Sequence, residues 1–176
     1  MGINPQGNYC SGYVCCRCNW GDIMCGIREL DLAEFPAREV RLIVIHCSGT
    51  PCNVPLTPCH LEQCHRSVGL SGIGFHYYVT RDGAVYNTRP VHEVGAHTPG
   101  FNLHSIGICY EGGRSFDNVP CDTRTTFQRS ALLDLVRRLQ KEYPGVMVKG
   151  HRQLTGDAGV VCPCFDAEGE YMLAKV

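Results

Sequence analysis

Short apolar runs along the chain predict the strands of a sheet. Residues 40–45 are mostly apolar and β-branched without alternation, which is typical of a central strand buried on both faces. This run stops at His46, before small and turn-forming residues. A similar run spans His104–Gly113, and residues 146–150 form another that leads into His151. His46 and His151 are therefore expected at the carboxyl ends of strands.

Two segments are predicted to be helices. Residues 57–68 carry Pro58 at the first helical position, where proline is tolerated, and Gly69 as a stop. The clearest helix follows Thr125, which forms a capping box with Gln128. Its predicted buried stripe consists of Phe127, Ala131, Leu135 and Leu139, with Leu132 and Val136 beside them.

The remaining elements complete one domain. Two β-rich runs joined by Asp82-Gly83 predict a hairpin, and residues 165–176 predict a short closing helix. Strands alternating with a few helices around one sheet indicate an α/β or α+β domain of five or six strands. We expect residues 1–29 to form a cysteine-rich arm and residues 30–176 to form the domain.

Charge and hydropathy exclude several partners. The 16 basic and 17 acidic residues are scattered and give a net charge of -1, so no nucleic-acid partner is expected. No run approaches the roughly 18 apolar residues of a membrane span, so no membrane insertion is expected. The start "MGINPQGNYCSGY" lacks the pattern of a signal peptide. We expect a monomer.

Thirteen cysteines are an excess that favours an oxidising compartment or bound metal. Five of them fall in the first 25 residues: Cys10, Cys15, Cys16, Cys18 and Cys25. Their spacing is not the two C-x2-C pairs, C-x2-C…C-x2-C, of a zinc ribbon. A disulfide-tied or loosely packed arm is therefore favoured over a small zinc knot.

Three residues are candidate metal ligands. His46 and His151 stand at strand ends, and Cys162 lies in the segment "CPCFD". Two imidazoles and a thiolate suit zinc with a fourth position left open. The alternative is that both histidines make ordinary hydrogen bonds and the thiol is structural, and spacing alone does not decide between them.

His97 is a candidate for contact with substrate. It lies in "VGAHTPGFN", a loop containing glycine and proline, where an imidazole could touch a bound molecule or polarise its carbonyl. A structural loop histidine is the alternative. His76, inside a strand, is expected to be a hydrogen-bonded core residue.

Five blocks occur in a characteristic order: "VIHCSGT", "GIGFHYYVTRDGAVY", "VGAHTPGFNLHSIGICYEGG", "GHRQL" and "CPCFD". Together, over about Val40–Asp166, they resemble the zinc N-acetylmuramoyl-L-alanine amidases of type 2. That family includes phage lysozyme-type amidases and animal peptidoglycan recognition proteins. The resemblance implies a central mixed β-sheet with flanking helices and a groove that receives the peptide stem of peptidoglycan. His46, His151 and Cys162 match the family's zinc ligands, and His97 matches a groove histidine.

The resemblance also implies a reaction. It is the zinc-dependent hydrolysis of the amide between the lactyl group of N-acetylmuramic acid and L-alanine, with peptidoglycan or a muropeptide as partner. Action on the cell wall places the protein in the periplasm or outside the cell. Cytoplasmic storage followed by phage-type release is an alternative route.

Two positions depart from the family pattern. Phe75 stands where active members carry a tyrosine that helps hold or deprotonate the zinc water, and Val160 stands where phage-type members carry a lysine. Tyr77 lies two residues from Phe75, so it is expected on the same face of the strand, about 6 to 7 Å along, as a substitute. Two hypotheses follow: an amidase, or a catalytically impaired zinc protein that binds peptidoglycan.

Overall fold

The computed structural model describes residues 38–172. The predicted arm, residues 1–29, lies outside this range, and the boundary at residue 30 stays a prediction. The strands are β1 (Leu42–Cys47), β2 (Thr50–Pro51), β3 (Tyr77–Val79), β4 (Val85–Asn87), β5 (Ser105–Tyr110), β6 (Gly113–Arg114) and β7 (Met147–Gly150). The helices are α2 (Pro58–Ser67), α3 (Thr126–Glu142) and α4 (Ala167–Met172), with 3₁₀ turns at Asn102–His104 and His151–Gln153.

Five strands form one mixed sheet in the order β4-β3-β5-β1-β7. β1 pairs in parallel with both β5 and β7, and β3 pairs in parallel with β5. β4 is antiparallel to β3, which confirms the hairpin predicted at Asp82-Gly83. β2 and β6 form a separate two-stranded sheet. The predicted fold class and strand number are therefore confirmed.

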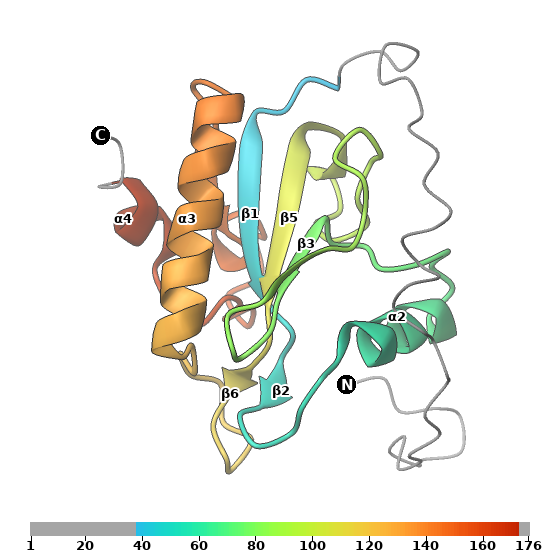
Figure 1. Cartoon of the computed structure of the whole chain (residues 1–176), viewed down its shortest axis with the longest axis vertical. Coiled ribbons are helices and arrows are strands. Elements are labelled where there is room, and N and C mark those ends of the chain that lie inside the picture. The colour runs from blue at the N-terminus through green and yellow to red at the C-terminus, as the bar shows by residue number, and fades with distance from the viewer. Residues whose placement is uncertain (1–37, 173–176) are drawn as a thin grey trace. The chain divides into compact units, whose positions relative to one another are not determined.

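Alternation along β1 divides the sheet into two faces. Ile43 and Ile45 enter the main apolar core with residues of α3. Leu61 of α2 belongs to a second cluster, with Tyr78 of β3. In Figure 1, α3 and α4 lie on one side of the sheet and α2 on the other. The sequence predicted that the strand stops at His46. Instead, β1 continues through His46 to Cys47, so this histidine is held in regular strand.

Helix α3 begins with the predicted capping box. Thr125 accepts a hydrogen bond from the backbone N–H of Gln128, whose side chain accepts from the N–H of Thr125. The predicted stripe is wrong at one position, because Phe127 is 68% exposed whereas Gln128 is fully buried. Closing the capping box turns Gln128 inward, where its amide donates to the carbonyl of Glu111.

In the described part of the chain, every helix is too short or too polar to cross a membrane.

The burial of Gln128 in place of Phe127 can be tested by mutation. Gln128→Leu keeps the volume but leaves the buried Glu111 carbonyl and the Thr125 N–H without these partners. We expect the free energy of unfolding to fall by about 2 to 4 kcal/mol, measured by urea denaturation. Phe127→Ala is the matched control and should change it by less than about 0.5 kcal/mol. The reverse ranking would contradict the burial described above.

Candidate metal centre and groove

Strand pairing brings His46 and His151 together. The parallel register sets Ile45 of β1 opposite Gly150 of β7, so the next residue of each chain segment lies at the same edge of the sheet. The two imidazole centroids are 4.6 Å apart. The carboxyl ends of two neighbouring parallel strands thus supply both histidines.

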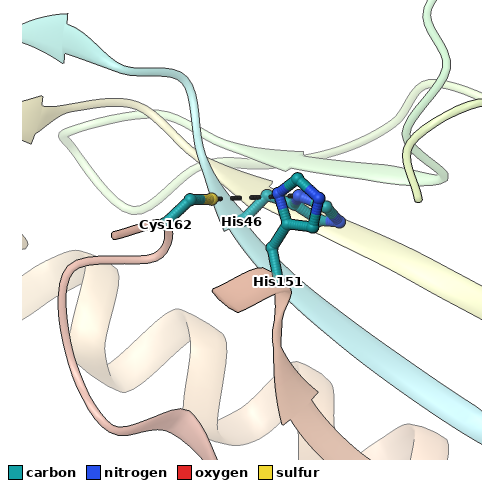
Figure 2. Close-up of side chains that lie close together, drawn as sticks. All are labelled: His46, His151 and Cys162. Carbon is teal, nitrogen blue, oxygen red and sulfur yellow. Dashed lines mark hydrogen bonds between the residues drawn. The ribbon is translucent and has the colours of Figure 1, made fainter. Parts of the chain in front are cut away.

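Cys162 completes the cluster from the loop that follows β7. Its Sγ lies 3.9 Å from Nδ1 of His46 (Figure 2). The ligand atoms of His46, His151 and Cys162 all lie within 4.8 Å of one another. The backbone N–H of Cys47 donates to Cys162 Sγ at 3.2 Å, which helps to orient this sulfur. The predicted ligand set is therefore assembled in space.

The second nitrogen of His46 is held by two neighbours. Its Nε2 lies 3.1 Å from Nδ1 of His97 and 3.2 Å from Oγ1 of Thr98. Thr98 Oγ1 is also 3.0 Å from His97 Nδ1. Neutral rings satisfy this triangle if His46 Nε2 donates into it and the Thr98 hydroxyl donates to His97. Nδ1 of His46 is then left as an acceptor facing Cys162, and such outer partners orient metal ligands.

The loop around His97 is fixed by a side chain and a glycine. Asn102 Oδ1 accepts from the N–H groups of His97 and Thr98, at 3.0 and 2.8 Å. A Cβ on Gly107 of β5 would come within 2.5 Å of the His97 ring, so only glycine lets this ring lie against the strand. His97 is thereby buried beside His46.

Burial keeps the imidazoles of the centre neutral. It holds the pKa of His46 well below its usual value, and the neighbouring rings of His97 and His151 lower it further. Burial lowers the pKa of His97 to about 3, and it also lowers the pKa of His151. Neutral imidazole is the form that binds a metal.

The three candidate ligands open into a groove of about 380 Å³. Its other lining residues are Cys47, Gly49, Phe75, His97, Gly113, Arg114, Pro120, Val160, Val161 and Cys164. Phe75, Val160 and Val161 are apolar side chains among these lining residues. Two nitrogen donors and one sulfur donor, open to a groove, match the ligand preference of zinc in sites that keep a free position.

Cys47 and Cys164 line the groove beside the ligands. Burial first, and then the nearby Cys47, raise the pKa of Cys164 to about 12. Contact with Cys162, followed by burial, raises the pKa of Cys47. Both are therefore neutral thiols near pH 7.

The structure places most of the predicted site residues together. Phe75 lies 5.1 Å from His46, centroid to centroid, and His97 lies beside both. The prediction that Tyr77 shares a face with Phe75 is wrong. Tyr77 belongs to the core cluster with α3, where Arg138 lies 5.8 Å from its ring, and it does not line the groove. Phe75 precedes the regular part of β3, so strand alternation does not reach it.

Sequence reasoning missed Thr98 and Arg114. Thr98 directly follows His97, and a hydroxyl next to a candidate histidine is the one local signal that could have indicated it. Arg114 reaches the groove from β6, a two-residue strand with no periodicity to read. The core role expected for His76 is confirmed, because it is fully buried and accepts from the N–H of Gly107 at 3.0 Å.

Fold and site together define a mixed α/β domain with a candidate metal centre at the carboxyl edge of its sheet, open to a groove. The chain belongs to the N-acetylmuramoyl-L-alanine amidase family, whose model matches residues 36–164. The family resemblance is therefore confirmed.

The relatives include both amidases and peptidoglycan recognition proteins. The endolysin of Enterobacteria phage K11 is 32% identical over 136 residues, which cover 77% of this chain and 88% of that endolysin. Among solved structures, the N-acetylmuramoyl-L-alanine amidase LysC from Clostridium intestinale superposes with a TM-score of 0.64 at 31% identity, covering 78% of this chain and 85% of LysC. A Drosophila PGRP-LB mutant in complex with tracheal cytotoxin gives a TM-score of 0.61 at 26% identity, covering 78% and 83%.

The buried histidines make the stability of the metal-free domain depend on pH. Burial lowers the pKa of His97 to about 3 and that of His76 to about 4, below the value of about 6.5 in an unfolded chain. Between about pH 6.5 and pH 4 the unfolded state therefore binds more protons. As the pH is lowered through this range, the free energy of unfolding should decrease by about 1.4 kcal/mol per pH unit for each histidine. Urea titrations with a chelator present measure this decrease.

Two variants separate this effect from general acid sensitivity. His76→Asn keeps an acceptor for the Gly107 N–H and should reduce the slope by about 1.4 kcal/mol per pH unit. His60→Gln, at an exposed histidine of α2, should leave the slope unchanged. A free energy of unfolding that stays constant between about pH 6.5 and pH 5 would rule out neutral buried rings.

Proposed function

We propose that this protein is a zinc-dependent N-acetylmuramoyl-L-alanine amidase that cleaves the amide between N-acetylmuramic acid and L-alanine in peptidoglycan. The observation that carries this proposal is the cluster of His46, His151 and Cys162, within 4.8 Å and open to a groove, in a chain of this family. The K11 endolysin and LysC support the same reading through their similarity over more than three quarters of the chain.

The residues of the cluster fit zinc. His46 would bind through Nδ1, because its Nε2 contacts His97 and Thr98. The thiolate of Cys162 would reduce the net charge of the centre, and the Cys47 N–H supports it. When bound, zinc would polarise the scissile carbonyl and acidify a water molecule.

The other groove residues would position the substrate. We infer that His97 acts first through His46, whose imidazole it orients, while its groove-facing edge contacts the substrate. The apolar side chains of Phe75, Val160 and Val161 would exclude water from the parts of the bound peptide that they touch. Tyr77 has no part in this proposal, because it packs under α3.

One observation favours the second hypothesis, a zinc-containing module that binds peptidoglycan without efficient cleavage. Phe75 and Val160 both line the groove, and neither can donate a hydrogen bond or accept a proton. Loss of one oxyanion donor typically lowers a rate by about two to three orders of magnitude. In either case the partner is peptidoglycan, which places the protein's action at the cell wall, in the periplasm or outside the cell.

The zinc assignment predicts the loss of one metal ion per chain in ligand variants. His46→Ala and Cys162→Ser should each bind one zinc ion fewer than the unmodified protein, counted by mass spectrometry of dialysed samples. The affinity of that site should fall by more than the roughly 10- to 100-fold that loss of an outer partner costs. His60→Ala is the matched control and should keep full occupancy. If His46→Ala also keeps it, the ligand assignment is wrong.

The amidase proposal predicts new L-alanine amino termini. Zinc-loaded protein incubated with muramyl tripeptide or whole sacculi should release them, as detected by amino-group labelling, and His46→Ala should not. Binding of sacculi without release would replace the amidase by the recognition module. If the protein neither binds sacculi nor releases L-alanine amino termini, both functions are refuted.

Phe75→Tyr separates an impaired enzyme from a different site geometry. If the missing hydroxyl limits turnover, restoring it should raise kcat/KM by about tenfold or more, because general acid-base groups contribute about 100- to 10,000-fold. Phe127→Tyr adds the same hydroxyl at an exposed position of α3 and should change nothing. An unchanged rate in Phe75→Tyr would show that Phe75 does not occupy the position of the family tyrosine.

A further inference from the structure

Two thiols that the metal centre does not use face each other beside it. Cys47 ends β1 and Cys164 follows the candidate ligand Cys162 by two residues, 117 positions away from Cys47 in the chain. Their Sγ atoms are 4.0 Å apart. Both residues are thiols in this structure, and both line the groove, so a dissolved oxidant can reach them.

The surroundings direct each sulfur toward the other. A Cβ on Gly113 would come within 2.5 Å of Cys47 Sγ, so the backbone of Gly113 closes one side of this thiol. Cys164 Sγ lies against the same residue and donates to its carbonyl at 3.2 Å. Cys162 Sγ is engaged differently, because it accepts from the Cys47 backbone and lies beside His46.

We propose that Cys47 and Cys164 form a disulfide that joins the end of β1 to the loop carrying Cys162. An S–S bond of about 2.05 Å requires the two sulfurs to approach by about 2 Å, a distance within reach of side-chain rotation. This proposal depends neither on the amidase activity nor on a bound metal.

The reaction is a two-electron oxidation by a small-molecule disulfide such as oxidised glutathione. One of the two cysteines, as a thiolate, attacks a sulfur of the oxidant, forms a mixed disulfide and expels one glutathione thiolate. The other cysteine then attacks the protein sulfur of that mixed disulfide and expels the second. The two cysteine protons end on the two glutathione thiols, so atoms and electrons balance.

The cross-link would join the two segments that hold His46 and Cys162. It would close a loop of more than 100 residues, and such loops give large stabilisation in the chain-entropy model. Cross-linking residues next to two candidate ligands would also fix the distance between those ligands in the metal-free protein.

The test is disulfide mapping of the full chain after incubation with oxidised glutathione at alkaline pH, with and without zinc. Mass spectrometry of the digest should show a peptide linked through Cys47 and Cys164. The melting temperature should rise by about 5 to 15 °C over the reduced protein. Cys164→Ser should lose both effects, and Cys59→Ser, at an exposed cysteine of α2, should keep both.

Mapping in the unmodified protein keeps the proposal testable even if Cys164→Ser folds poorly. A link between Cys47 and Cys162 would overturn it, as would a link from Cys164 to Cys121, whose N–H donates to the same Gly113 carbonyl. Thiols of Cys47 and Cys164 that both remain open to alkylation after the incubation would overturn it as well.

Discussion

The site depends on the parallel pairing of β1 with β7. This pairing sets Ile45 opposite Gly150 and therefore His46 beside His151. Since side chains alternate along β1, the same register buries Ile45 under α3 and turns His46 to the other face. A slip by one residue would bring His46 into the apolar core and Ile45 into the groove. The burial energy that fixes the sheet register thus also fixes the positions of both imidazoles.

A second set of interactions makes the buried imidazole of His46 usable. An unpaired polar ring in this position would be costly, but Thr98 and His97 pair with its Nε2 and Asn102 holds both of them in place. Gly107 provides the space for the His97 ring. The contacts that satisfy these buried groups also leave Nδ1 of His46 as an acceptor facing Cys162, so the same contacts serve stability and keep a candidate ligand atom in place.

The strands, the main helices and the three candidate ligands could be predicted because each carries a local signal. Apolar runs mark the strands, and His46 and His151 each directly follow one of these runs. The errors share one cause, which is that tertiary contacts override local periodicity. Phe75 precedes the regular strand, so it does not share a face with Tyr77. Gln128 turns inward to complete a cap and donate to another segment, which no count of apolar residues could reveal.

The apolar side chains that line the groove have different consequences for substrate binding and for hydrolysis. In the proposed function, Phe75, Val160 and Val161 would lower the local dielectric and so strengthen the attraction between a charged centre and a polarised amide. The same side chains offer no hydrogen bond to the negative charge that develops on the amide oxygen during hydrolysis. That charge would have to be stabilised by the centre itself, by backbone N–H groups or by the polar side chains that line the groove, His97 and Arg114. If the proposed function holds, these apolar side chains would contribute to holding a peptide stem rather than to its cleavage, and a hydroxyl at position 75 would add a polar group beside the centre because Phe75 lies against His46.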